Sequence, residues 1–167
     1  MERSKRIRAV ATVLAAALAL FVLGGCAQQG TAANQQQSQN RAYMAQVNQV
    51  MEDLKGRLEG FSDAVSRGDV VGMRTQADNA FKAIDDLNGL EAPDDLKDVQ
   101  QEYVDGAAKL EEALSEYVSL YTEIDSATDA QPFDWASYDD RVAQIQSLYD
   151  EGTGKLQSGD NKASEKS

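Results

Sequence analysis

The chain of 167 residues has no histidine, a single cysteine and only two prolines. The lack of histidine excludes imidazole as a metal ligand, as a haem ligand and as a general base. A single cysteine cannot form a disulfide bond within the chain, so the fold must be held together by packing. Because proline interrupts helices, its scarcity, together with abundant Ala, Leu, Gln, Glu, Asp and Lys, favours a helical protein.

Catalytic motifs are also missing. No serine stands in a Gly-x-Ser-x-Gly sequence, which is typical of many serine hydrolases. Carboxylates are numerous, but hydrolysis by a carboxylate pair requires two that face each other across a cleft, and no spacing in the sequence indicates such a pair. We therefore expect that the protein is not an enzyme and that it carries no cofactor.

Residues 1–25 have the layout of a secretory signal peptide. A basic start, with Arg3, Lys5, Arg6 and Arg8, is followed by an apolar run and then by small residues. The run over residues 9–25 contains 17 uncharged residues, which is the lower limit for crossing a bilayer. It is rich in Ala and Gly and no basic cluster follows it, so a signal peptide is favoured over a membrane span.

The run ends in Leu23-Gly24-Gly25-Cys26, which contains the only cysteine. This stretch resembles the lipobox of bacterial lipoproteins. The resemblance implies that the Cys26 thiol receives a diacylglycerol, that residues 1–25 are removed and that acyl chains hold the protein on the extracytoplasmic face of a cell membrane. Two acyl chains suffice for stable anchoring. Two alternatives stay open: cleavage at another bond, which leaves Cys26 as a thiol, and a retained transmembrane helix.

The remainder of the chain is strongly acidic. Without residues 1–25, which carry four basic residues and one acidic residue, the net charge is −15. Such a surface repels nucleic acid phosphates and anionic lipid headgroups. We therefore expect no nucleic acid partner and a membrane contact only through the lipid on Cys26. Residues 26–40, composed mainly of Gln, Asn, Ala, Ser and Gly, predict a flexible tether.

Four later segments have apolar residues at alternating spacings of three and four, the pattern of amphipathic helices packed lengthwise. Asp69 is placed to cap the second helix, and Gly89 to end it. We expect the fourth helix to fray at Gly152 and Gly154. The segments cover residues 41–66, 70–88, 93–124 and 135–156, and their apolar stripes run over 44–65, 73–87, 96–124 and 135–149.

Short connections between these segments predict an all-α fold, an up-down four-helix bundle over residues 41–156. The alternative is a three-helix bundle with the fourth helix as an outer strap. Four helices are favoured because each stripe is too narrow to be covered by one neighbour. Residues 157–167 are polar and predict a disordered tail.

Aromatic residues on the last two segments form a candidate site. One interpretation is a pocket at one end of the bundle for a small apolar or cationic ligand, since the acidic charge would favour a cation. The other is a set of boundary positions with packed rings and hydroxyls in water. The residues are Tyr103, Tyr117, Tyr121, Trp135, Tyr138 and Tyr149.

Acidic clusters lie near the predicted helix ends, in residues 85–86, 91–98 and 134–140. Carboxylate clusters can bind Ca²⁺, but none matches the Asp-x-Asp-x-Asp-Gly calcium loop, and helix capping explains them. We expect no metal site. Arg67-Gly68-Asp69 matches the integrin-binding tripeptide, but the turn at this position explains the three residues.

These observations favour a membrane-tethered, extracytoplasmic module of the cell envelope with a structural or interaction role and another envelope protein as its partner. The alternative is a ligand-binding or sensory bundle that captures a small cation, a polyamine, an apolar molecule or a divalent cation. An exposed apolar patch would favour the first function, and an internal cavity among the tyrosines the second.

Overall fold

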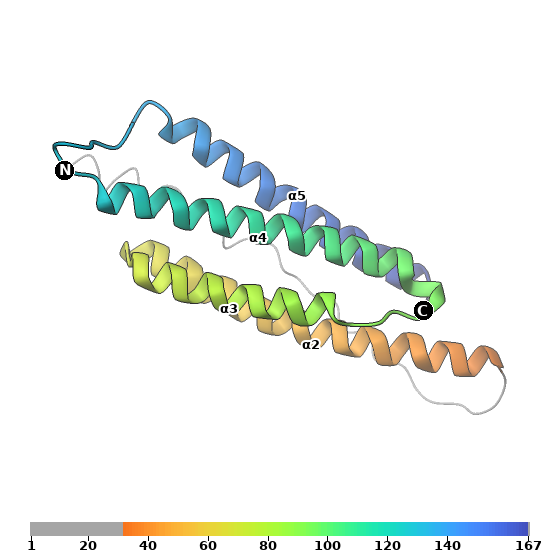
Figure 1. Ribbon diagram of the computed structural model, residues 1–167. Coiled ribbons are helices and arrows are strands. Elements are labelled where there is room, and N and C mark those ends of the chain that lie inside the picture. Colours follow the sequence, from red (N-terminus) through yellow and green to blue (C-terminus); the bar gives the residue numbers. More distant parts are fainter. Residues whose placement is uncertain (1–31, 167) are drawn as a thin grey trace.

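The computed structural model describes residues 32–166, in which four α-helices run up and down in an elongated bundle (Figure 1). No strand occurs in these residues. The all-α, up-down four-helix prediction is therefore confirmed. The elements are α2 (Ala32–Arg67), α3 (Val70–Asn88), the short 3₁₀ helix η1 (Asp94–Leu96), α4 (Lys97–Ser126) and α5 (Tyr138–Glu165).

The predicted signal peptide and the stretch from Leu23 to Cys26 lie outside the described residues. Within residues 32–166, no helix combines the length and the apolar character needed to cross a membrane.

Consecutive helices pack against each other along the bundle, and the contact between α4 and α5 is the most extensive. The first and last helices, α2 and α5, approach each other at far fewer positions. The fold therefore consists of two helical hairpins, α2–α3 and α4–α5, joined mainly through α3 and α4. The side between α2 and α5, called here the α2–α5 seam, is the least tightly closed.

The apolar stripes predicted from the sequence form the core. Every position of the second stripe, over residues 73–87, is buried. The first stripe is buried over residues 47–65 and the third over residues 96–121. In these three stripes only the outermost positions, Met44 and Ile124, are half-buried. The spacing of three and four thus identified the core-facing side of each helix.

The turn between α2 and α3 has the predicted cap. The Gly72 amide donates a hydrogen bond to Oδ1 of Asp69 at 2.8 Å, which satisfies one of the free amides of the first turn of α3. Gly68 has a φ of 66°, a conformation that glycine adopts without a steric penalty. The prediction of Gly89 as the end of α3 is also confirmed, since its amide bonds to the Asp85 carbonyl at 3.0 Å.

The prediction of a flexible tether over residues 26–40 is wrong for residues 32–40, which belong to α2. Ala and Gln are good helix formers, and a helix already nucleated at residue 41 extends over them at little cost. The extension also packs against the bundle, because Asn40 and Tyr43 are buried.

The predictions of fraying near Gly152 and of a disordered tail are wrong as well, the latter for residues 157–165. Helix α5 continues to Glu165, and Leu156, Gly159 and Ala163 are buried in it. Gly152 and Gly159 let α5 approach α4 closely, so packing outweighs the low helix propensity of glycine.

Trp135 does not begin the fourth helix, which starts at Tyr138. It lies in the preceding loop with 42% of its surface exposed. Asp134 organises this loop: its Oδ1 accepts a hydrogen bond from the Ala136 amide at 3.0 Å, and its carbonyl accepts one from the Ser137 hydroxyl at 2.9 Å. The rest of the predicted stripe faces the core.

Candidate functional site

The six aromatic residues predicted to form one site do not all come together. Tyr117, Tyr121 and Tyr138 gather near the α4–α5 loop, where Trp135 packs beside Tyr138 with ring centroids 5.8 Å apart. Tyr103 lies fourteen residues before Tyr117 on the same helix, which places it about 20 Å away.

Tyr103 belongs to a different environment at the other end of α4. Its hydroxyl donates a hydrogen bond to Oδ1 of Asp160 at 2.6 Å. Burial, followed by this hydrogen bond, raises the pKa of Tyr103. The prediction that Tyr103 shares a pocket with the other tyrosines is wrong, because the residues of α5 that face it were assigned to a disordered tail.

The rings of Tyr117 and Tyr121, one helical turn apart on α4, are stacked with their centroids 4.7 Å apart and an interplanar angle of 9°. Phe61 of α2 meets the Tyr117 ring edge-on, at 5.5 Å and 75°. Both arrangements are favourable for aromatic pairs. The edge-on contact of Phe61 with Tyr117 therefore joins α2 to α4 across the core.

The hydroxyl groups of this stack are buried. Those of Tyr117 and Tyr121 make no hydrogen bond of regular geometry to any described part of the chain. A buried hydroxyl without a partner costs about 1–3 kcal/mol. Burial raises the pKa of Tyr117 to about 12, and burial, followed by the influence of the neighbouring Tyr117 hydroxyl, raises the pKa of Tyr121.

The neighbouring hydroxyls influence one another's acidity. Tyr121 lowers the pKa of Tyr117, and Tyr138 lowers the pKa of Tyr121, in both cases against the larger effect of burial. The Tyr117 hydroxyl itself has no hydrogen-bond partner of regular geometry among residues 32–166.

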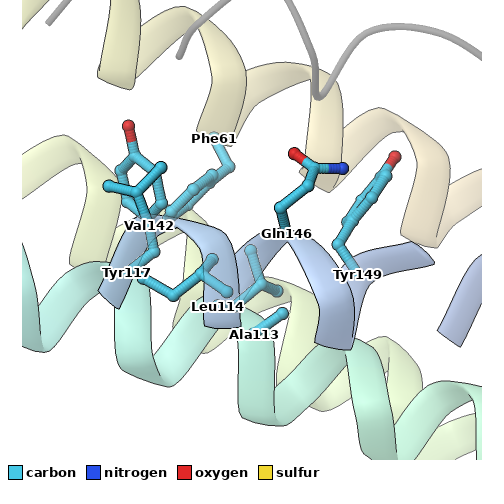
Figure 2. A pocket seen from close by; sticks show the side chains of 8 residues that line it. Phe61, Ala113, Leu114, Tyr117, Val142, Gln146 and Tyr149 are labelled. Carbon is cyan, nitrogen blue, oxygen red and sulfur yellow. The ribbon is translucent and has the colours of Figure 1, made fainter. Parts of the chain in front are cut away.

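Beside the stack, a small apolar cavity opens at the α2–α5 seam (Figure 2). Its volume of about 20 Å³ is enough for one water molecule. In Figure 2 the Phe61 ring reaches the Tyr117 ring, and the polar ends of Tyr117, Gln146 and Tyr149 point to the same side. The cavity is lined by Phe61, Ala113, Leu114, Tyr117, Val142, Ile145, Gln146 and Tyr149.

The lining contains no ionisable group other than the two tyrosines. Burial raises the pKa of Tyr149 as well as that of Tyr117, so both are neutral at physiological pH. An apolar wall of this kind disfavours a charged ligand because it cannot replace the hydration of the charge. The chemistry available here is therefore apolar contact combined with donation from a tyrosine hydroxyl.

A wider and more open groove of about 380 Å³ lies between α3 and α4, where the sequence had indicated no site. Arg74 crosses it and donates a hydrogen bond to Oγ1 of Thr122 at 2.9 Å. Glu123 at its edge pairs with Arg141 of α5 at 2.5 Å. The groove is lined by Arg74, Ala77, Asp78, Phe81, Ser115, Val118, Ser119, Thr122 and Glu123.

The end of the bundle with the α2–α3 turn and the α4–α5 loop, here named the distal end, carries exposed apolar side chains. Trp135 is 42% exposed and Val71, in the first turn of α3, is 75% exposed. Phe133 packs edge-on against Trp135 with centroids 5.0 Å apart. Among residues 32–166, Val71 and Trp135 are the two large hydrophobic residues that are exposed.

The acidic clusters are exposed and dispersed. Within the described residues, no group of three or more carboxylates is placed to hold a metal ion. Asp94 pairs with Lys97 at 2.6 Å, and Asp98 pairs with Lys166. In both cases the hydrogen bond from the lysine is the main cause that lowers the pKa of the carboxyl group.

A comparison of the chain with protein families, with characterised proteins and with solved structures gives no match. The proposals below therefore rest on the residues and on their geometry.

Proposed function

We propose that this protein is a lipid-anchored, extracytoplasmic lipoprotein and that its helical bundle is a non-catalytic interaction module of the cell envelope. The anchor rests on the order of residues 1–25 and on Leu23-Gly24-Gly25-Cys26, which resembles a lipobox. The non-catalytic role rests on the absence of histidine and of a free cysteine once Cys26 carries its lipid.

The position of Cys26 relative to α2 gives the bundle an orientation. Cys26 lies six residues before Ala32, the first residue of α2, and six residues span at most about 20 Å. A lipid on Cys26 would hold the start of α2 close to the membrane. Helix α2 has 36 residues and is about 54 Å long, so the distal end would project away from the bilayer.

The observation that carries the interaction role is that the two exposed large hydrophobic side chains, Val71 and Trp135, both belong to this distal end. Tryptophan is enriched in protein interfaces, where it supplies a large share of the binding energy. The neighbouring Asp134, Asp139 and Asp140 are exposed. A partner with an apolar pocket surrounded by basic side chains would be complementary to this surface.

The anchor is tested by replacing Cys26 with Ala in the native host. The wild-type protein should be shortened, acylated and recovered with membranes, whereas Cys26→Ala should keep its signal peptide and incorporate no labelled fatty acid. Acylation of the Cys26→Ala variant would show that the lipid is attached elsewhere and would refute the lipobox interpretation.

The interaction role is tested by cross-linking in intact cells, with Trp135 replaced by the photo-reactive amino acid p-benzoylphenylalanine. A second chain with the same amino acid in place of Ala143, exposed on α5, is the matched control. We expect a discrete adduct at position 135 that is suppressed by excess wild-type protein but not by a Trp135→Ala variant. Equal adducts at both positions, or none at 135, would refute a specific contact at the distal end.

A further inference from the structure

We propose that the α2–α5 seam beside Phe61, Tyr117 and Tyr149 is a binding site for a small, neutral, largely apolar molecule that carries one hydrogen-bond-accepting oxygen. This inference is independent of the lipid anchor and of a partner at the distal end. It rests on the cavity, on a buried hydroxyl without an acceptor, and on the loose closure of the seam.

The walls of the cavity determine the body of the ligand. Phe61 contributes an aromatic wall from α2, Leu114 an aliphatic wall from α4 and Ile145 a wall from α5. No Asp, Glu, Lys or Arg lines it. A charged ligand would lose its hydration without compensation, which excludes polyamines and divalent cations from this position. A neutral apolar or aromatic body fits.

The Tyr117 hydroxyl determines the polar group of the ligand. Tyr117 is 1% exposed, its ring lines the cavity, and its hydroxyl makes no regular hydrogen bond to residues 32–166. The proton of this buried hydroxyl therefore lacks an acceptor in the described part of the chain. A carbonyl or ether oxygen supplies an acceptor without bringing a charge.

The seam determines how such a ligand enters. A cavity of about 20 Å³ holds about one water molecule, so a larger ligand requires that α2 and α5 separate. These helices belong to different hairpins and touch at few positions, and the side chains between them include the half-buried Val142 and Gln146. The α2–α3 hairpin can therefore shift without breaking the extensive α4–α5 contact.

The test compares two probes of the same shape, acetophenone and α-methylstyrene, which differ in that a carbonyl oxygen is replaced by a methylene group. Binding to the full chain in lipid nanodiscs is followed by NMR of ring-labelled tyrosines. We expect saturable shifts of Tyr117 and Tyr149 with acetophenone, and binding about tenfold tighter than that of α-methylstyrene, since one additional hydrogen bond has this effect.

Two variants assign the binding to the proposed site. Tyr117→Phe keeps the stacked ring, and it should bind both probes equally weakly. Ala113→Leu fills the cavity and should abolish binding of both probes. Tyr43→Phe, which removes a buried hydroxyl from the other half of α2, is the matched control and should retain the difference between the probes.

Three results would overturn the proposal. The first is equal affinity of the wild-type protein for the two probes. The second is a preference for acetophenone that survives in Tyr117→Phe. The third is the absence of any saturable shift, in which case the cavity is a packing defect and the Tyr117 hydroxyl is satisfied by a water molecule. Partition of each probe into lipid is measured with empty nanodiscs and corrected for before the two probes are compared, and for any one probe it is the same for all variants.

Discussion

Gly106 of α4 and Gly152 of α5 bring the backbones of these two helices into direct contact. A Cβ atom on Gly106 would lie 2.8 Å from the carbonyl oxygen of Gly152, and one on Gly152 would lie 2.9 Å from the carbonyl oxygen of Gly106. Both positions are buried. This reciprocal fit explains why the α4–α5 pair has the most extensive contact of the bundle.

The first prediction concerns Gly152→Ala. The added methyl group would push the helices apart, and overpacking of this kind typically costs about 1–3 kcal/mol. Gly154→Ala is the matched control, because a Cβ there meets no atom within 4 Å and alanine favours helix by up to about 1 kcal/mol. Denaturant unfolding should show Gly152→Ala to be less stable and Gly154→Ala to be as stable as wild type or more so. Equal effects would contradict the backbone contact.

The second prediction tests whether the end of α5 contributes to the fold. Leu156 is 2% exposed and packs against Gly106, so Leu156→Ala should lose about 2–5 kcal/mol of unfolding free energy. The neighbouring Gln157 is exposed, and Gln157→Ala should change stability by less than about 0.5 kcal/mol. If this segment were a disordered tail, thermal unfolding would give the same midpoint for both variants.

The core of the bundle was predictable because its signal is repeated. In α3, for example, Met73, Ala77, Ala80, Ile84 and Leu87 alternate by three and four, and all five are buried. A single apolar residue can lie on either side of a helix, but a whole series with this spacing identifies the side that faces the core. The cap at Asp69 was predictable for a similar reason, because a side-chain acceptor before an apolar run has few other roles.

The end of α5 was not predictable, because glycine gives two opposite signals. Gly152, Gly154 and Gly159 lower helix propensity, which indicates a frayed end. Two of them, Gly152 and Gly159, instead form close contacts with α4. Whether a glycine ends a helix or admits a neighbour depends on the position of that neighbour, which the sequence of α5 does not contain.

The candidate site was partly predictable, and its error follows from the error in α5. In the antiparallel register, Asp105 pairs with Lys155 at 3.3 Å and Tyr103 bonds to Asp160. A fourth helix that ends near residue 156, as predicted from the sequence, leaves Tyr103 no neighbours other than the remaining aromatic residues. Tyr117, Tyr121 and Tyr138 do gather, as the stripes indicated. The contribution of Phe61 could not be foreseen, since it depends on how the two hairpins meet.

The third prediction concerns the cap of α3. Asp69→Ala removes the acceptor for the Gly72 amide, and loss of such a cap costs about 0.5–2 kcal/mol. Asp69→Asn keeps a side-chain oxygen at the same place and should restore most of the lost stability. Urea unfolding monitored by circular dichroism distinguishes the two variants. An Asn variant as unstable as the Ala variant would mean that charge, and not the hydrogen bond, is what matters at this position.

The fourth prediction is a loss of stability at alkaline pH. Burial raises the pKa of Tyr43 and of Tyr117 from the ordinary value of 10.0 to about 12. In the unfolded chain these groups lose their protons near pH 10, whereas in the folded chain they keep them. Between pH 10 and 12 the unfolded state therefore binds fewer protons, and the free energy of unfolding must fall as the pH rises. Below pH 10 both states are protonated, and the contribution of these tyrosines is fully present.

Ultraviolet absorbance of tyrosinate and circular dichroism, recorded on the same samples across this range, check the fourth prediction. The tyrosinate signal should rise together with the loss of helix, because the buried hydroxyls ionise when the bundle opens. Tyr43→Phe and Tyr117→Phe should each make the decline of unfolding free energy between pH 10 and 12 shallower. Each substitution removes one group that loses its proton in the unfolded chain but keeps it in the folded chain. A tyrosinate signal that rises gradually near pH 10 with the helices intact would show that these hydroxyls are in contact with water. In that case the Tyr117 hydroxyl would already have water as an acceptor. It would then give the proposed site no preference for a ligand that carries an oxygen.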